Sequence, residues 1–354
     1  MLLRPFFFRV TSMDGKRIYK FIGPWVLAIC LPGCIVTQPQ KVPHQPVRLT
    51  DSELNRDYFV YRPSAYGKFP MPLVVTCHGT NPWDSAQMQI NEWKYLAETN
   101  NFVVIAPVIN SARGFIPPGP PEGTNILKDD ERFILKIIQP YLTSPNIDNR
   151  ATMITGWSAG GFATYYVGLR HPEIFRVVVA RQCNFVQEYY PEEARRANPY
   201  QPVLIFYGKG DLPILKADSQ VAYRFLKDAG HKNLFVLGLD GGHSRRPEVA
   251  LDFFNNAIKM YPSPKIMSAR LFNDGSCRIR FGAGIVGASS GDERIFWDFG
   301  DGDSGPGNIV DHRYNRPGRY RLAVMHNYKD QVLRFTGIID IQRGSLAIKP
   351  GVKK

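Results

Sequence analysis

One pentapeptide, Gly156-Trp157-Ser158-Ala159-Gly160, constrains this chain more than any other feature. The apolar run 151–155 precedes it, and the helix-compatible run 161–166 follows it. A strand, a sharp turn and a helix around one serine are typical of a nucleophile elbow, whose glycines let strand and helix approach closely. The alternative is a turn of small residues that merely allows a helix to pack, and the flanking runs favour the elbow. Ser158 is therefore the candidate nucleophile.

A serine hydroxyl needs a histidine to take its proton and a carboxylate to orient that histidine. Behind an elbow the order along the chain is nucleophile, acid, histidine. His243 lies in a glycine-containing loop between an apolar run and the last helix pattern of the region, where it can reach Ser158. His171 and His231 are more simply explained as solvated loop residues. The other four lie elsewhere: His44 in a tether, His78 before the nucleophile, and His312 and His326 in a second domain.

The acid is expected at the end of a strand between Ser158 and His243. Asp211 follows the apolar run 203–207 after two glycines that turn its carboxylate back toward the site. Its alternative role is a helix cap. Asp240 is a rival because it is close to His243 in sequence, whereas Asp218 and Asp228 fall on a helix pattern and are expected to face water.

Negative charge on the former carbonyl oxygen of a tetrahedral intermediate requires backbone amides. One amide is expected from Ala159, directly after the nucleophile. The other is expected from the loop after run 73–77, where Gly79 allows a tight backbone. Thr80 is the preferred donor and Asn81 the second choice. His78 is interpreted as a structural residue of this loop.

Apolar runs alternate with helical patterns between residues 57 and 262, which predicts βαβ crossovers and a mainly parallel sheet. Such sheets bind ligands at the carboxyl ends of their strands. The expected strands are 58–61, 73–77, 102–106, 151–155, 177–180, 203–207 and 234–237, and the expected helices are 84–100, 128–141, 161–170, 218–229 and 247–260.

From residue 263 the pattern changes to short strands and turns. Three motifs stand in order, Trp297-Asp298-Phe299-Gly300-Asp301-Gly302, His312-Arg313-Tyr314 and Pro317-Gly318-Arg319-Tyr320. They resemble those of a PKD domain, an immunoglobulin-like β-sandwich, over residues 263–343. Turn chemistry explains the acidic residues of the first motif more simply than calcium does. We expect no metal and no cofactor.

Residues 57–262 resemble the serine-esterase branch of the α/β-hydrolases, particularly polyhydroxybutyrate depolymerase-like and feruloyl or acetylxylan esterase-like proteins. The resemblance is carried by His78-Gly79, Gly156–Gly161, Gly208–Asp211 and Gly241–Ser244. It implies hydrolysis of a carboxylic ester through an acyl-enzyme. Relatives often place a histidine where this chain has Tyr207, which weakens the substrate assignment and not the triad.

The amino-terminal residues 1–34 combine basic residues with a short apolar stretch, as in a signal peptide. Leu31-Pro32-Gly33-Cys34 resembles a bacterial lipobox, so Cys34 is the candidate lipidation site, with ordinary signal-peptidase cleavage as the alternative. Residues 35–56 are predicted to be an extended tether and residues 344–354 a basic tail. Among the other cysteines, Cys77 and Cys277 lie in different domains, which does not indicate a disulfide framework.

Forty-four Lys and Arg residues against thirty-one Asp and Glu residues give a net charge of +13, dispersed along the chain. No nucleic-acid-reading motif accompanies this charge, so we expect no nucleic-acid partner. Trp83, Trp157 and Asn81 are candidates for a substrate cleft. The expected partner is an ester substrate on a polysaccharide or polyester, with the PKD-like part as a spacer or a contact module for carbohydrate or protein.

The sequence therefore predicts an exported serine esterase, either secreted or held in the cell envelope as a lipoprotein. Two alternatives stay open. A serine peptidase of the prolyl-oligopeptidase type shares the triad and the fold, although no propeller repeats precede this region. A catalytically inactive surface-binding or adhesion protein would keep the fold without the reaction.

Overall fold

Strands and helices alternate through the first domain of the computed structural model, which describes residues 43–114, 118–190, 198–258, 261–262, 264–283, 295–328, 331–342 and 345–350. Eight strands form one sheet in the order β1-β2-β4-β3-β5-β6-β7-β8, parallel from β4 to β8. The strands are β1 Val47–Asp51, β2 Arg56–Tyr61, β3 Met71–Cys77, β4 Val103–Pro107, β5 Ile147–Ser158, β6 Val177–Cys183, β7 Val203–Gly208 and β8 Leu234–Leu239. The mainly parallel α/β architecture expected from the sequence is confirmed.

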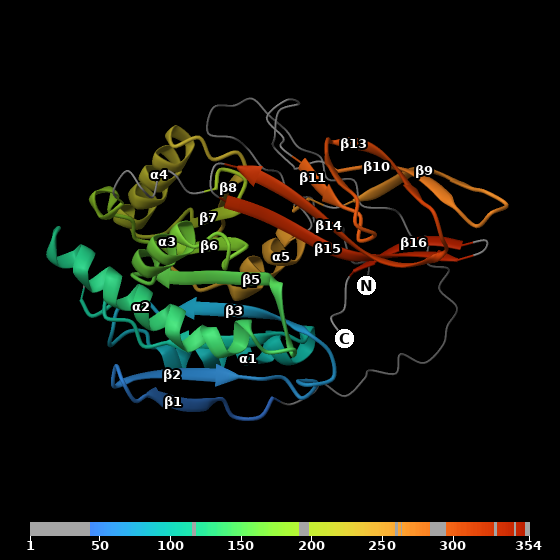
Figure 1. The fold of residues 1–354 in the computed structure, drawn as a ribbon. Coiled ribbons are helices and arrows are strands. Elements are labelled where there is room, and N and C mark those ends of the chain that lie inside the picture. Colours follow the sequence, from blue (N-terminus) through green and yellow to red (C-terminus); the bar gives the residue numbers. More distant parts are fainter. Residues whose placement is uncertain are drawn as a thin grey trace, which may run out of the picture.

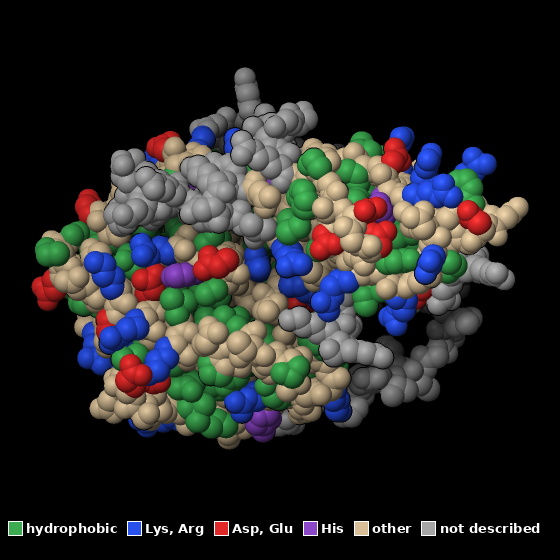
Figure 2. Space-filling view, in the orientation of Figure 1, with side chains coloured by type: hydrophobic (Ala, Val, Ile, Leu, Met, Phe, Trp, Pro, Cys, Tyr) green, Lys and Arg blue, Asp and Glu red, His purple; other side chains and the backbone are tan. Residues whose placement is uncertain are grey.

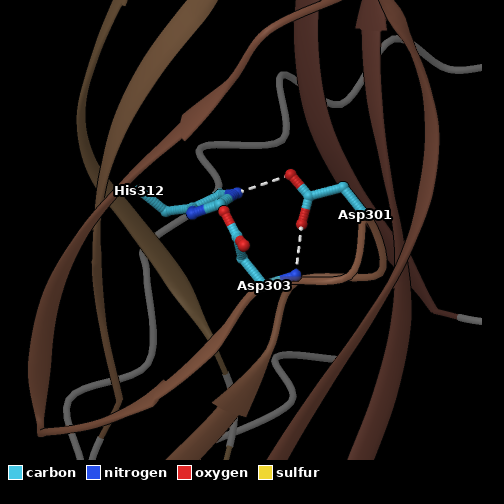
Figure 3. A group of neighbouring side chains, drawn as sticks. All are labelled: Asp301, Asp303 and His312. Atoms are coloured by element: carbon cyan, nitrogen blue, oxygen red, sulfur yellow. Dashed lines mark hydrogen bonds and ion pairs between the residues drawn. The ribbon is translucent and has the colours of Figure 1, made fainter.

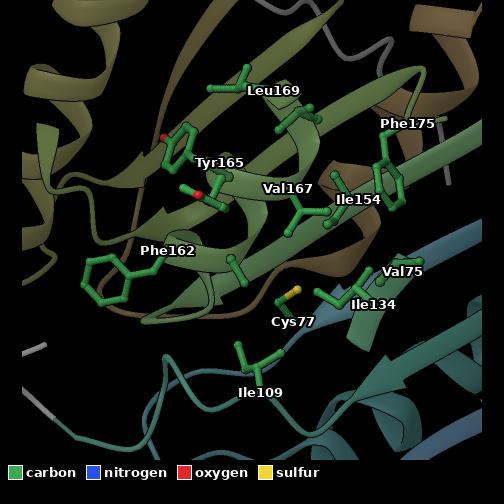
Figure 4. Close-up of a cluster of buried hydrophobic side chains, with 14 of the residues drawn as sticks. Val75, Cys77, Ile109, Ile134, Ile154, Phe162, Tyr165, Val167, Leu169 and Phe175 are labelled. Carbon is green, nitrogen blue, oxygen red and sulfur yellow. The ribbon is translucent and has the colours of Figure 1, made fainter. Parts of the chain in front are cut away.

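Helices cover both faces of this sheet, because buried parallel strands present apolar side chains in both directions. Leu73, Val75 and Cys77 of β3 face one hydrophobic cluster, and Val74 faces the other. The first cluster packs under α2 Glu122–Leu142, α3 Gly161–Arg170 and α4 Pro213–Asp228, and part of it is drawn in Figure 4. The second packs under α1 Ala86–Asn100 and α5 Pro247–Ala257, with Trp93 fully buried.

The second domain consists of two antiparallel sheets packed as a sandwich, drawn in orange to red in Figure 1. Their strand orders are β13-β10-β9 and β12-β11-β14-β15-β16. The strands are β9 Lys265–Leu271, β10 Cys277–Gly282, β11 Ile295–Asp298, β12 Ser304–Pro306, β13 Ile309–Tyr314, β14 Gly318–Tyr328, β15 Gln331–Gln342 and β16 Ser345–Pro350. The predicted small all-β sandwich is confirmed.

Aromatic residues of the sequence motifs form the core of this sandwich. Trp297 is fully buried, and its indole donates a hydrogen bond to the Gly307 carbonyl over 2.6 Å. The buried Tyr314 hydroxyl donates to the Phe299 carbonyl over 3.1 Å. Gly300, at φ +79°, has the left-handed conformation that the turn after β11 requires.

The sandwich contacts the first domain at the amino-terminal ends of the parallel strands. Arg150, near the start of β5, donates to the Thr336 carbonyl of β15 over 2.8 Å. Tyr200, just before β7, packs edge-on against His326 of β14 with ring centroids 4.7 Å apart. Tyr261 belongs to the same core cluster as Trp297, and its hydroxyl donates to the Arg176 carbonyl just before β6. The carboxyl ends of the strands thus face away from the sandwich (Figure 1).

Two predicted segment boundaries are wrong. Within the predicted tether 35–56, Val47–Asp51 forms the edge strand β1, paired antiparallel with β2. Within the predicted basic tail 344–354, Ser345–Pro350 forms β16 on β15. In both segments short strands pair their backbone with a neighbouring edge, which needs little burial of side chains.

The predicted signal segment 1–34, including the candidate lipidation site Cys34, lies outside the described residues. Among the described helices, none has the length and apolar character needed to cross a membrane. Cys77, Cys183 and Cys277 are buried free thiols.

Candidate active site

Ser158 lies at the end of β5, directly before α3, with a left-handed backbone at φ +54°. A β-carbon on Gly156 would clash with Thr164 and the Gly160 backbone, and one on Gly160 would clash with the Cys77 carbonyl. These two glycines therefore permit the close strand and helix approach that forces the serine into a strained conformation. The elbow places Ser158 at the carboxyl edge of the sheet.

Asp211 and His243, 32 residues apart in sequence, form an ion-pair contact at this same edge. His243 Nδ1 lies 3.1 Å from Asp211 Oδ1, and the Asp211 side chain is completely buried. The same carboxylate accepts the Leu212 amide at 2.7 Å, but the N-cap of α4 is Leu212 and has no side-chain cap bond, so Asp211 does not have the alternative role of a helix cap. The rival Asp240 has a side chain that is 91% exposed and pairs with Lys209 at 2.7 Å.

The His243 ring stacks on Trp157, the residue before Ser158, with ring centroids 4.4 Å apart and planes 22° apart. This places the imidazole beside the nucleophile elbow. Among the described residues, no hydrogen bond joins the Ser158 hydroxyl to the His243 ring. Burial lowers the pKa of His243 below its ordinary 6.5, and the Asp211 charge opposes this effect.

The loop that carries His243 is held by two polar residues of β6, which sequence reasoning missed. Gln182 donates to the Gly242 carbonyl over 3.0 Å and accepts from the Ser244 amide over 2.5 Å. The fully buried Arg181 donates to the Arg245 carbonyl over 3.1 Å. Two polar residues inside the otherwise apolar strand β6 are the sequence signal that could have found them.

The backbone amides of the loop after β3 differ in whether they have acceptors. The Gly79 amide donates to Asp84 over 2.7 Å, and the Asn81 amide donates to the Ala112 carbonyl over 3.0 Å. Among the described residues, the amides of Thr80 and Ala159 have no acceptor. A β-carbon on Gly79 would lie 3.2 Å from the Ser158 β-carbon, so this loop lies directly against the elbow. This geometry favours Thr80 over Asn81 as the second oxyanion donor.

His78 holds the same loop from inside. Its Nδ1 is 2.7 Å from the Gly79 carbonyl, and its Nε2 accepts the Ile109 amide over 3.1 Å. Burial lowers the pKa of His78, so the ring stays neutral with its proton on Nδ1. These contacts support the structural role expected for His78.

Asp84, a third residue that the sequence did not single out, connects this loop to the His243 loop. Its buried carboxylate accepts the Gly79 amide, the Gln89 side chain at 2.7 Å and the Arg245 guanidinium at 2.9 Å. Arg245 also stacks over the Trp157 ring at 4.6 Å. One carboxylate thus links the predicted oxyanion loop with the loop of the candidate base.

The substrate-cleft candidates lie at the rim of this edge. Trp83 is 59% exposed, Asn81 is exposed, and Trp157 is half-buried between His243 and Arg245. A cavity of about 100 Å³ lies beside α3, lined in part by Ser111, Phe162 and Tyr189.

Two histidines set aside as solvated loop residues have other environments. His231 is buried, and desolvation lowers its pKa to about 4, which contradicts the solvated interpretation. His171 contacts Glu131 at 2.7 Å and Glu173 at 3.1 Å. Asp218 accepts hydrogen bonds from Asn184 and Phe185 instead of facing water. None of these contacts involves Ser158.

In the sandwich, Asp301, Asp303 and His312 bring their side chains close enough to share a metal ion (Figure 3). His312 Nε2 lies 2.8 Å from Asp301, whose other oxygen accepts the Asp303 amide at 3.2 Å. The His312 ring also stacks on Phe299 with centroids 4.0 Å apart. These contacts hold the turn after β11 against β13.

Comparison with known proteins assigns both domains to known folds. A CE1 ferulic acid esterase of the anaerobic fungus Anaeromyces mucronatus matches with a TM-score of 0.50 at 16% identity, over 64% of this chain and 94% of that chain. The first domain has the α/β-hydrolase fold. The family model of the PKD domain matches residues 262–333, and that of the prolyl oligopeptidase family matches residues 127–190.

A curated relative of this α/β-hydrolase is a bifunctional acetylxylan esterase/xylanase of Neocallimastix patriciarum, 30% identical over 111 residues. The aligned part covers 31% of this chain and only 15% of that relative. A solved acyl-protein thioesterase 2 of Zea mays also matches, with a TM-score of 0.44 at 17% identity, over 57% of this chain and 98% of that chain.

Proposed function

We propose that this α/β-hydrolase cleaves carboxylic esters through an acyl-enzyme on Ser158, with His243 as base and then acid and Asp211 as its orienting carboxylate. The observation that carries the proposal is the His243–Asp211 pair at 3.1 Å, with the imidazole stacked on the residue that precedes a strained serine. Ser158 follows β5, and the Asp211–His243 pair follows β7 and β8, at the sheet edge where this fold binds ligands, which supports the proposal.

In the proposed reaction the Ser158 oxygen attacks the ester carbonyl carbon while its proton moves to His243 Nε2. The negative oxygen of the tetrahedral intermediate accepts hydrogen bonds from the Thr80 and Ala159 amides. His243 then protonates the departing alcohol oxygen, which leaves the acyl group on Ser158. Water, deprotonated by His243, repeats the attack and releases the acid. Losing one oxyanion donor typically costs about 2.7–4 kcal/mol of transition-state stabilisation.

The substrate that we propose is an acyl ester carried by a polysaccharide or polyester. The name of the curated relative, an acetylxylan esterase/xylanase, supports a polysaccharide ester. The exposed Trp83 offers a flat apolar surface for a sugar or phenolic ring.

We further propose export through residues 1–34, with Cys34 as the lipid anchor. Incorporation of labelled palmitate into the chain and its loss in Cys34→Ser would support the anchor, whereas release of unlabelled protein would refute it.

A serine peptidase of the prolyl-oligopeptidase type is the second candidate, favoured by the family-model match over residues 127–190, which includes Ser158. Rates on p-nitrophenyl acetate, feruloyl esters and aminoacyl anilides separate the two. The esterase proposal predicts cleavage of the esters, and a clear preference for the anilides would replace it.

Labelling with a fluorophosphonate probe and peptide mapping tests the mechanism itself. We expect one modified peptide, carrying the label on Ser158, and no label in Ser158→Ala. Label on another serine would refute the assignment, and no label at all would favour an inactive binding or adhesion protein.

A further inference from the structure

Three arginines stand in one row across the sheet β13-β10-β9 of the sandwich. The strand register pairs Arg278 of β10 directly with Arg313 of β13 on one side and with Arg270 of β9 on the other. All three are exposed, while their neighbours Cys277 and Ile279 face the core. Like charges directly opposite each other destabilise a sheet, so folding alone does not favour this row.

Nearby carboxylates neutralise only part of this charge. Arg280, two residues along β10, forms a two-pronged pair with Asp311 at 2.8 and 3.1 Å. Arg313 lies 3.4 Å from Asp274. In the described part of the chain, no carboxylate lies within ion-pair distance of Arg270 or Arg278. Two guanidinium groups on this face are therefore available for an external anion.

The row lines an open groove of about 580 Å³, formed by Ser268, Ala269, Arg270, Arg278, Arg280, Asp311, His312 and Arg313. Figure 2 shows Lys and Arg side chains gathered at this end of the sandwich, where Figure 1 draws β9, β10 and β13. Phe272, which follows β9, lies beside the row, and the guanidinium groups of Arg270 and Arg313 are each 5.2 Å from its ring centroid. An aromatic ring thus borders the cationic groove.

We propose that this arginine groove binds an acidic polysaccharide, a polymer of uronate sugars. Guanidinium groups match planar carboxylates with paired hydrogen bonds. Neighbouring strands place successive arginines about 4.7–4.9 Å apart, which suits a polymer with a carboxylate on every repeat. The partly exposed Phe272 adds apolar surface beside the groove that a sugar ring can contact.

The groove lies on the sandwich, and the candidate active site lies at the far edge of the first domain's sheet. The proposed binding of acidic polysaccharide is therefore argued only from the charges and the strand register of the sandwich. Its consequence, that ester cleavage is directed to acidic polysaccharide, rests on the proposed function. A tethered binding module raises the local concentration of substrate without a new contact at the catalytic site.

The test measures binding of the full chain to polygalacturonate by affinity electrophoresis and calorimetry. The double variant Arg270→Gln, Arg278→Gln removes the two unpaired charges. Arg316→Gln, Arg321→Gln is the matched control, since it removes two exposed charges from the same domain outside the groove. We expect at least a tenfold loss of affinity in the first variant, unchanged affinity in the control, and weaker binding of the wild type as salt rises.

Equal affinity of the two variants would overturn the proposal. So would arginine-dependent binding of duplex DNA or of phosphatidylglycerol vesicles in preference to polygalacturonate. Hydrolysis of p-nitrophenyl acetate, measured on the same samples, should be unchanged in both variants. If the wild type hydrolyses the ester but does not bind polygalacturonate, only the role of the groove is refuted. Arginine-dependent binding without any hydrolysis refutes only the proposed function.

Discussion

The backbone of Ser158 is held at φ +54°, where a residue with a β-carbon is strained by about 1–3 kcal/mol. That strain is compatible with folding because Gly156 and Gly160 leave room for the turn. The turn places Ser158 at the edge of the sheet where His243 and Asp211 form their pair. The backbone conformation that suits Ser158 for nucleophilic attack therefore lowers the stability of the fold.

Substitution of Ser158 separates these two effects. We expect Ser158→Ala and Ser158→Gly both to abolish ester hydrolysis, because neither has a nucleophile. Ser158→Gly should have a free energy of unfolding about 1 kcal/mol higher than that of Ser158→Ala, since glycine adopts positive φ without steric cost. Its urea midpoint should therefore be higher. Urea titrations followed by circular dichroism measure the difference, and equal midpoints would argue against backbone strain at the elbow.

The charge beside His243 determines the pH range of the proposed reaction. His243 acts as a base only when neutral, so kcat/KM should fall as pH drops through its pKa, which burial places below 6.5. Arg245 disfavours the imidazolium further. Arg245→Gln should therefore raise this pKa and move the acid limb of the profile to higher pH.

Arg246→Gln is the control for this measurement, because Arg246 is adjacent in sequence and more exposed. Its acid limb should coincide with that of the wild type. A limb that moves to lower pH in Arg245→Gln would show that the charge of Arg245 does not govern His243.

At the scale of elements, β6 anchors the loop that bears the candidate base. Gln182 donates a hydrogen bond to the Gly242 carbonyl and accepts one from the Ser244 amide. Arg181 donates one to the Arg245 carbonyl. A backbone group left without its partner inside a protein costs about 1–3 kcal/mol. This strand therefore determines where His243 stands although it contributes no candidate catalytic group.

Gln182→Met keeps the side-chain volume and removes both hydrogen bonds to the loop. We expect kcat for p-nitrophenyl acetate to fall about tenfold, which corresponds to about 1.4 kcal/mol, with KM little changed. Hydrogen exchange of residues 240–246 should accelerate. Gln187→Met, at an exposed position of the 3-10 helix η1 Gln187–Tyr189, should behave like the wild type. Unchanged kcat in Gln182→Met would remove β6 from the positioning of His243.

The sequence predicts Ser158, Asp211 and His243 as catalytic candidates, because the elbow, the glycines after β7 and the glycine loop before α5 are local patterns. Asp84 gives no such local signal, since its partners lie across the fold. Gln182 is marked by its polar character in an apolar strand, but this pattern does not show which backbone groups it binds. The edge strand β1 was missed because prolines and glutamines dominate the composition of residues 35–46 just before it. A half-exposed edge strand leaves only a weak apolar pattern.

The whole molecule is joined by aromatic residues from both domains. Tyr200 and Tyr261 belong to the hydrophobic cluster of the sandwich, together with Trp297 and Tyr314. Removing a large buried aromatic side chain typically costs about 3–5 kcal/mol. The two domains are therefore expected to unfold together.

Tyr200→Ala tests this coupling. We expect differential scanning calorimetry of the wild type to show one transition and that of Tyr200→Ala to show two, with the sandwich melting first. Tyr95→Ala, which removes a tyrosine that is 59% exposed, is the control and should keep a single transition. Two transitions already in the wild type would show that the shared aromatic cluster does not couple the domains.

The sandwich adjoins the amino ends of the parallel strands, and Ser158 stands at their carboxyl ends. The proposed binding groove and the candidate active site, on opposite sides of the molecule, cannot both contact the same short stretch of polymer. Material held by the sandwich would stay out of reach of the serine, and the acyl groups removed would come from strands lying alongside it. The arrangement suits a dense, many-stranded matrix better than a solitary dissolved molecule.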